Sequence, residues 1–309
     1  MTSIGRITFC LCRSIRCANR NQAIVPNPEV EPTLQSTVSK TILDQKMPAE
    51  LMRDYIFPYV GFNEMGMKSI SETNASLNKE YWHNCLSTRC CELNLTTVHD
   101  KNQLIIFLEK IKDIKKLKIR GLHNPAKLKL FINAINSLDA TVRFDNLSHL
   151  NLSRNGLSSN NFLELHDVFL SRTKLLMYLN LTDNDIEADG AIGIANSTYL
   201  QHLTSLDISV NNIEDAGIKA IAESVYMTNL TSLIICWSRV GDIGAIAIAN
   251  SVHMKKLIFL DLASNDIGDA GVRAILESTH LNKLILLDLF NNSISENVRQ
   301  LIRARFSNI

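Results

Sequence analysis

Leucine and isoleucine recur in a fixed motif along the C-terminal part of the chain. The motif is Leu-x-x-Leu-x-Leu/Ile-x-x-Asn, with Ser238 at the asparagine position of one copy. Two weak copies begin at Cys90 and Ile114, and a full copy begins at Leu147. Five further copies start 27 residues apart, at Leu176, Leu203, Leu230, Leu257 and Leu284. This alternation of apolar residues predicts a short strand at the start of each repeat.

The second half of each repeat has a different apolar spacing. In segments such as 213–222 and 267–276, apolar residues fall at i, i+3 and i+4, which predicts an amphipathic helix. One strand and one helix cannot bury these side chains alone, whereas stacked repeats bury them against their neighbours. We therefore expect an α/β solenoid over residues 89–309, with parallel strands on a concave face and helices on a convex face.

The asparagine that follows each strand predicts a second feature of the stack. Its side-chain amide can bond backbone groups that are left unpaired where the strand bends, and it can join the next repeat in a ladder. Small residues on the helices, such as Gly217 and Gly244, predict close packing of the helical layer.

The N-terminal part of the chain differs in composition and in the spacing of its apolar residues. Residues 1–46 contain Pro26, Pro28 and Pro32 and few large apolar residues, so we expect a disordered tail. From Met47 to residue 88 the apolar spacing and Pro48 predict a small helical unit. Such a unit could serve only as a cap on the first repeat, because the open core of a solenoid requires one.

Composition narrows the class of protein. The sequence is 46% hydrophobic with a formal charge of +1, so bulk charge indicates no nucleic-acid partner, and it lacks a long apolar run that would span a membrane. Its seven cysteines favour a reducing compartment, and we expect a cytoplasmic protein. Basic residues flank three cysteines of the tail, Cys10, Cys12 and Cys17. One interpretation is that a lipid is attached to these cysteines.

The repeat motif, followed by Asp-Ala-Gly and an Ala-Ile-Ala helix, resembles the leucine-rich repeat. The resemblance is to the strand-plus-helix form found in ribonuclease inhibitor and in innate immune sensors, and it covers roughly residues 90–309. It implies a protein-binding scaffold. The last helix, expected over 296–305, almost reaches the end of the sequence, so we expect no catalytic domain after it.

Residues 47–88 resemble an F-box. Met47-Pro48 stands where the family has Leu-Pro, Glu50-Leu51 and Ile56-Phe57 match, and Tyr81-Trp82 closes the segment, while Pro58 departs from the pattern. An F-box before leucine-rich repeats is frequent in eukaryotes and in secreted effectors of intracellular bacteria. The resemblance implies a substrate-recognition subunit of a cullin-type ubiquitin ligase, which docks a Skp-type adaptor through one apolar surface. That surface comprises Pro48, Leu51, Ile56, Phe57 and Val60.

Strand residues between the leucines are expected to face the concave side, because side chains alternate along a strand. Aromatic and acidic residues there are candidates for binding a target protein. The candidates are Tyr178, Asp207, Ile234, Trp237, Phe259, Asp261 and Asp288. Two alternatives stay open: Trp237 could instead fold over the missing ladder asparagine, and Leu286 and Phe290 could pack at the C-terminal edge.

Lys116, Lys118 and Arg120 alternate and should share one strand face, either to meet an acidic group or as solvated charges. No phosphate-binding loop, Gly-x-Ser-x-Gly or His-Glu-x-x-His motif occurs, and we expect neither enzymatic activity nor a cofactor.

Overall fold

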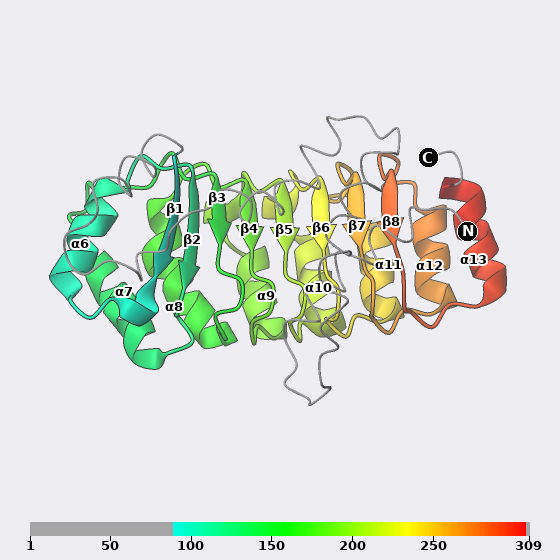
Figure 1. The fold of residues 1–309 in the computed structure, drawn as a ribbon. Coiled ribbons are helices and arrows are strands. Elements are labelled where there is room, and N and C mark those ends of the chain that lie inside the picture. Colours follow the sequence, from blue (N-terminus) through cyan, green and yellow to red (C-terminus); the bar gives the residue numbers. More distant parts are fainter. Residues whose placement is uncertain (1–88, 307–309) are drawn as a thin grey trace, which may run out of the picture. The chain divides into compact units, whose positions relative to one another are not determined.

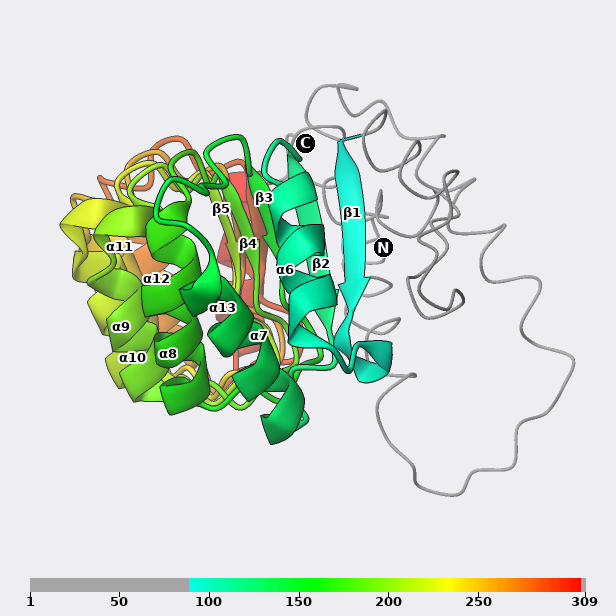
Figure 2. The same cartoon turned by 90° about the vertical axis from the view of Figure 1, so that its left-hand side faces the viewer.

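The structure, a computed structural model, describes residues 89–306. Eight parallel strands form one sheet in sequence order, and the helices lie on one side of it (Figures 1 and 2). The strands are β1 (Cys90–Asn94), β2 (Lys116–Arg120), β3 (His149–Asn151), β4 (Tyr178–Asn180), β5 (Ser205–Asp207), β6 (Ser232–Ile234), β7 (Phe259–Asp261) and β8 (Leu286–Asp288).

A helix follows each strand and returns the chain to the start of the next one. The helices are α6 (Lys101–Lys110), α7 (Pro125–Ser137), α8 (Ser159–Phe169), α9 (Ala188–Ala195), α10 (Glu214–Glu223), α11 (Asp242–Asn250), α12 (Asp269–Glu277) and α13 (Glu296–Phe306). Short 3-10 turns stand at η3 (Leu95–Thr97), η4 (Leu170–Arg172), η5 (Thr198–Leu200) and η6 (Val225–Met227). The two weak motif copies are therefore real strands, β1 and β2, and the whole forms the expected α/β leucine-rich-repeat solenoid.

The motif leucines form one continuous core between the sheet and the helices. The middle residue of each short strand is in register with its neighbours, so that Leu179 lies opposite Leu206 and Leu206 opposite Leu233. All three are no more than 1% exposed. Burial of each such side chain contributes about 1.5–3 kcal/mol, and it is available only when the next repeat is present.

The predicted asparagine ladder is confirmed. The Asn184 side-chain nitrogen donates to the Leu152 and Leu181 carbonyls at 3.1 and 2.8 Å, while its oxygen accepts the N–H groups of Asn155 and Leu157 at 3.1 Å. One side chain thus satisfies backbone groups of two repeats at the bend after the strand.

Ser238 fills the same position in the repeat of β6 with fewer bonds. Its hydroxyl donates to the Cys236 carbonyl at 3.1 Å and to the Ile208 carbonyl at 3.4 Å. A serine side chain is too short to accept the backbone N–H groups that an asparagine oxygen accepts at this position. In the preceding repeat, the Glu214 N–H instead donates to the Ser238 carbonyl at 3.1 Å, and Glu214 adopts a left-handed φ of 53°. Ser238 and Glu214, the first residue of α10, therefore make the backbone hydrogen bonds where the ladder asparagine is missing.

Helices of successive repeats are joined by caps and close approach. Asp242 Oδ1 of α11 accepts the N–H groups of Gly268 and Gly271, both at 2.8 Å, at the start of α12. At Gly244 a Cβ atom would lie 2.4 Å from Ile218 Cγ2, so only glycine permits this spacing. The small helical residues thus have the expected packing role.

Several sequence-based expectations lie outside the described residues. They are the tail over 1–46 with Cys10, Cys12 and Cys17, the helical unit over 47–88, and the adaptor-binding residues Pro48, Leu51, Ile56, Phe57 and Val60. Within residues 89–306, none of the helices has the length and apolar character needed to cross a membrane.

Candidate functional site

Two rows of side chains face away from the core across the sheet. One row runs through the first residue of each short strand, with Tyr178, Ser205, Ser232 and Phe259 in successive register. The second row runs two residues further along. It comprises Glu92, Lys118, Asn151, Asn180, Asp207, Ile234, Asp261 and Asp288. We call these rows, with the residues that continue them after the strand ends, the strand face.

The acidic residues of the second row have a structural role that the sequence analysis did not assign. Oδ1 of Asp207, Asp261 and Asp288 accepts the N–H two residues downstream, at 3.0, 3.0 and 2.8 Å. Asn151 and Asn180 make the same turn at 2.9 Å. Asn or Asp recurring at this position was the available signal, because both residues cap turns in this way.

Two of these three carboxyl groups are also buried, while Asp288 is half-buried. Asp207 is 5% and Asp261 4% exposed. Burial raises the pKa of Asp207, and hydrogen bonds from Ser209 and Thr182 oppose that shift. Burial, together with the neighbouring negative charge of Asp288, raises the pKa of Asp261 to about 7. Asp261 is therefore a strand-face group whose charge changes near neutral pH.

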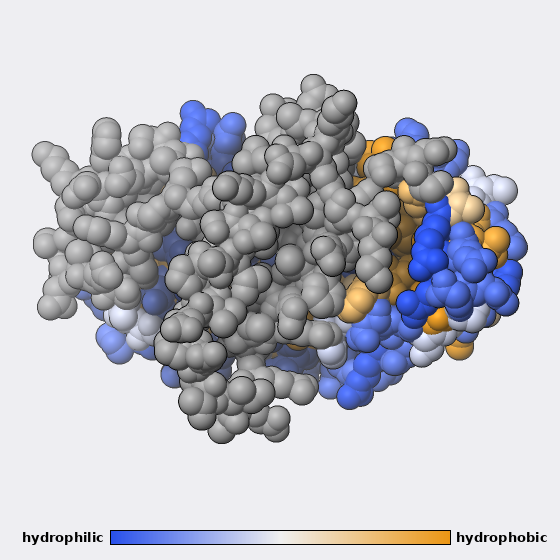
Figure 3. All heavy atoms as spheres, turned by 45° about the vertical axis from the view of Figure 1, so that its right-hand side comes forward, coloured by the Kyte–Doolittle hydropathy of each residue, from blue (hydrophilic) through white to orange (hydrophobic). Residues whose placement is uncertain are grey.

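The predicted apolar residues gather over β6 to β8. Trp237 is 38% exposed and follows β6 with a φ of 56°, while Ile234 and Phe259 are half-buried. None of the three belongs to the core. At the C-terminal edge, Leu286 is half-buried and Phe290 is 47% exposed. Figure 3 shows exposed apolar side chains at this end of the molecule, next to polar ones.

Tyr178, another predicted contact residue, is stacked on His149. Their ring centroids are 4.0 Å apart with an interplanar angle of 15°. Burial, and secondarily the positive charge of Lys116, lowers the pKa of His149 to about 3. The imidazole is therefore neutral at physiological pH and serves as a flat partner for the tyrosine ring.

The N-terminal end of the strand face is basic. Lys116, Lys118 and Arg120 share this face of β2, as expected, while Leu117 and Ile119 between them are in the core. Arg120 pairs with Glu92 at 2.6 Å, and Arg154, after β3, lies 3.7 Å from Asp183. Burial is the main cause of the lowered pKa of Lys118.

An Asp167–His166–Ser197 arrangement has the order of a hydrolytic triad. His166 Nε2 lies 2.6 Å from Ser197 Oγ, and His166 Nδ1 lies 2.9 Å from Asp167 Oδ1. Ser197 is, however, only 3% exposed. Its counterparts in the next repeats, Ser224 and Ser251, bond backbone carbonyls between helices. The arrangement is therefore part of the packing between repeats.

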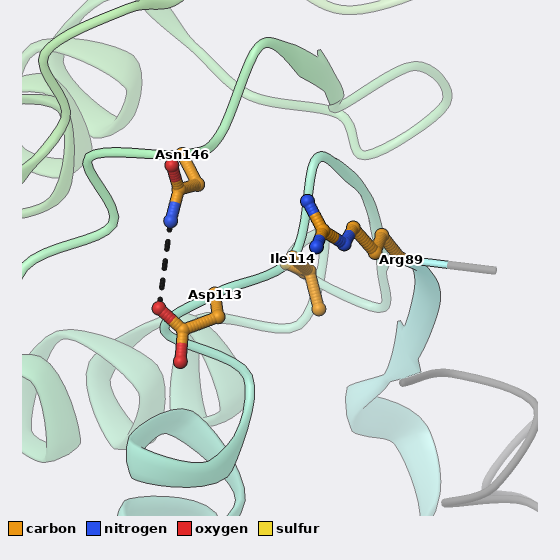
Figure 4. Close-up of a pocket in the computed structure, with 4 residues that line it drawn as sticks. All are labelled: Arg89, Asp113, Ile114 and Asn146. Atoms are coloured by element: carbon orange, nitrogen blue, oxygen red, sulfur yellow. Dashed lines mark hydrogen bonds between the residues drawn. The ribbon is translucent and has the colours of Figure 1, made fainter. Parts of the chain in front are cut away.

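A recess of about 340 Å³ lies where β1 and β2 begin (Figure 4). It is lined by Arg89, Asp113, Ile114 and Asn146, with the Asn146 amide donating to Asp113 at 3.4 Å. The lining holds no nucleophile with an adjacent base. Among residues 89–306, no group of His, Cys, Asp and Glu side chains is placed to hold a metal ion.

Stacked parallel strands, outer helices and an asparagine ladder define a leucine-rich-repeat solenoid. The family model described as a leucine-rich repeat matches residues 174–195, 199–222, 226–249 and 253–276, so the chain contains these repeats by sequence as well as by geometry. No curated protein sequence matches the chain. The leucine-rich-repeat fold is typical of scaffolds that bind proteins and carry out no catalysis.

Solved structures with a similar fold include two from different organisms. An internalin from Listeria monocytogenes is 19% identical, with a TM-score of 0.36, over 65% of this chain and 68% of the internalin. The yeast complex of Rad7 and Elc1 contains a chain that is 13% identical, with a TM-score of 0.35, over 71% of this chain and 67% of that one. Both TM-scores lie below 0.5, and neither similarity bears on what the chain binds.

Proposed function

We propose that this protein is a non-enzymatic adaptor whose repeats bind a target protein on the strand face. The observation that carries the proposal is that Trp237, after β6, is exposed, and Ile234 of β6 and Phe259 of β7 are half-buried, all three outside the core. Large aromatic side chains dominate protein interfaces because they bury much area at a low entropy cost. Tyr178 and Asp288, both half-buried, complete the contact surface, whereas Asp207 and Asp261 are buried and cap turns and are not part of it.

The finer proposal is that residues 47–88 dock a Skp-type adaptor of a cullin-type ubiquitin ligase. Its support is the F-box-like pattern of this segment and its place directly before leucine-rich repeats. Under this proposal the chain catalyses no reaction itself. It raises the effective concentration of a ubiquitin-loaded partner near the target protein. The protein would act in the cytoplasm, which is the host cytoplasm if it is a secreted effector.

The alternative is a plain binding or inhibitory scaffold in which residues 47–88 only cap the first repeat. It differs from the adaptor in one respect, the affinity for a Skp-type protein.

Affinity capture with four forms of the full chain separates these possibilities. Purified Skp-type adaptor should bind the unchanged chain and the Trp237→Asn/Phe259→Ala variant, and should lose binding at least tenfold on Leu51→Asp. Asparagine suits position 237 because it accepts the left-handed backbone there. Target proteins should instead be lost on Trp237→Asn/Phe259→Ala and kept on Val252→Ala, which removes exposed apolar surface elsewhere.

Targets that remain bound to Trp237→Asn/Phe259→Ala would contradict the strand-face site. If the unchanged chain does not bind the Skp-type adaptor, the adaptor proposal is contradicted, and the plain binding scaffold is the function that remains.

A further inference from the structure

The turns that lead from a helix to the next strand lie side by side along one edge of the sheet. We call this edge, formed by the turns before β4 to β8, the turn edge; it comprises residues 172–177, 198–204, 225–231, 252–258 and 279–285. Backbone hydrogen bonds continue the sheet into these turns, as from the Thr231 N–H to the Thr204 carbonyl at 2.8 Å. Side chains join them too, since Lys256 Nζ donates to Asn229 Oδ1 at 2.6 Å. Because the strands begin in register, the turns form one continuous, flat edge.

The charge of the turn edge differs from that of the edge at which the helices begin. The turn edge contains five Lys or Arg residues, three His residues and no Asp or Glu. Ten Asp or Glu residues and one Arg lie at the opposite edge, over residues 183–189, 210–216, 237–243, 264–270 and 291–297. Among these acids, Asp215 and Asp242 cap helix starts, which explains their place. Glu223 and Glu277 end α10 and α12 and precede the turns.

The lysines of the turn edge have no evident role in the fold. The exposed ones are Lys174, Lys255, Lys256 and Lys283. None of them pairs with a carboxylate among residues 89–306. A helix end attracts cations only within about its last turn, whereas α11 already ends at Asn250 and α12 at Glu277. These charges are therefore available to a partner.

Exposed apolar side chains collect at the same edge. Six of the twelve large apolar side chains that are exposed among residues 89–306 belong to it: Leu175, Met177, Tyr199, Val225, Val252 and Ile285. Val225 and Val252 occupy the same position in two repeats and are 61% and 55% exposed. Met227 and Met254, two residues further along, are fully buried and fix each turn to the core. The valines are thus held outwards between lysines.

We propose that the turn edge binds the surface of an anionic lipid membrane without spanning it. The lysines attract the negatively charged headgroups, and each one near such a surface strengthens binding about fivefold. The valines insert shallowly among the headgroups. Four strand steps of about 4.8 Å separate the first and last turns, so a flat contact about 19 Å long forms, and the acidic edge faces away from the lipid.

A lipid surface fits the turn edge better than a nucleic acid does. Nucleic acids are held by basic groups together with aromatic rings on which bases stack. The two most exposed apolar side chains here, Val225 and Val252, are aliphatic, and such side chains gain from the apolar layer below the headgroups. The inference is independent of the proposed function, because target binding uses the strand face.

The test measures binding of the full chain to lipid vesicles. It should bind vesicles that contain about one-third phosphatidylserine in phosphatidylcholine, and not phosphatidylcholine alone. Raising the ionic strength from about 0.1 to about 0.5 M should weaken this binding. Lys255→Gln/Lys283→Gln should weaken it about tenfold or more. Lys101→Gln/Lys129→Gln, which removes two exposed charges elsewhere, should change it about twofold or less.

A second pair of variants tests the apolar contact. Val225→Ser should weaken vesicle binding about threefold, because less apolar surface leaves the water. Its control is Ile243→Ser, since Ile243 is 66% exposed but lies at the acidic edge, and it should bind as the unchanged chain does. The strand-face variant Trp237→Asn/Phe259→Ala should also bind the vesicles unchanged, even if it loses target proteins.

Absence of binding to the phosphatidylserine vesicles, or equal binding to phosphatidylcholine alone, would overturn the proposal. Equal losses in Lys255→Gln/Lys283→Gln and Lys101→Gln/Lys129→Gln would show that the turn edge is not the contact. If the chain ignores the vesicles but binds polyglutamate or polyuridine, the edge recognises an acidic protein or an RNA, and the membrane proposal is wrong.

Discussion

Asp207, Asp261 and Asp288 illustrate how one side chain can have two roles. One carboxylate oxygen of each caps the turn after its strand, which explains why Asn serves equally well in β3 and β4. The negative charge is an addition to this role, and it costs stability where the group is buried.

Asp261 should make folding stability depend on pH. Its folded pKa of about 7 lies above the value of about 3.9 expected in the unfolded chain, so the folded state binds the proton more tightly. The free energy of unfolding should therefore fall as the pH rises from about 4 to about 7. Burial, Asp288 and Asp207 raise the pKa of Asp261, and hydrogen bonds from the Ala263 N–H and from Cys236 lower it.

The variant Asp261→Asn removes this contribution while it keeps the turn. Between pH 5 and pH 8 its urea midpoint should fall less than that of the unchanged chain, and at pH 8 it should be the more stable by on the order of 1 kcal/mol or more. Asp189→Asn, an exposed charge on α9, is the control. Parallel pH profiles for Asp261→Asn and the unchanged chain would contradict the assignment.

At the scale of elements, the starts of α9, α11 and α12 are each capped by a side chain of the preceding repeat. The carboxylate of Asp215 caps two N–H groups at the start of α11, at 2.7 and 2.9 Å, and Asp242 does the same for α12. Ser159 bonds the first turn of α9 in the same manner, at 3.0 and 3.2 Å. The unpaired N–H groups of a helix start are thus satisfied across the repeat boundary.

Loss of one such cap should be measurable. Asp242→Ala removes the acceptor for Gly268 and Gly271 and should lower the free energy of unfolding by about 1 kcal/mol. Asp189→Ala, in the first turn of α9, is the matched control and should cost less. Chemical denaturation of both variants checks this, and equal losses would show that helix charge, and not the cap, is responsible.

At the scale of the molecule, stability depends on contacts between neighbouring repeats. Among residues 89–306, β8 and α13 pack against one neighbouring repeat, that of β7 and α12. There all residues of β8 are half-buried, and Val298 is the fully buried residue of α13. In α10, by contrast, Gly217, Ile218, Ile221 and Ala222 are all buried between repeats. Opening should therefore begin at α13.

Hydrogen exchange tests this gradient. Backbone amides of β8 and α13 should exchange faster than those of α10 and α11 by at least tenfold. Val298→Ala should accelerate exchange in α13 and leave α10 unchanged, because a repeat contacts only its neighbours. Equal rates along the stack, or a response of α10 to Val298→Ala, would indicate a single cooperative unit.

The sequence by itself determined the repeat, the strand and helix in each copy, the leucine core and the asparagine ladder. These follow from local spacing: a fixed period of 27 residues places equivalent side chains over one another whatever the finer geometry. It also determined which strand residues face away from the core, since side chains alternate.

The tertiary structure alone decided what those residues do. It showed that the aspartates of the second row cap turns, that Ser238 and Glu214 bond each other's repeat where the ladder asparagine is missing, and that His149 stacks on Tyr178. Burial and ring stacking depend on distances between strands far apart in sequence, and only the packed sheet sets those distances.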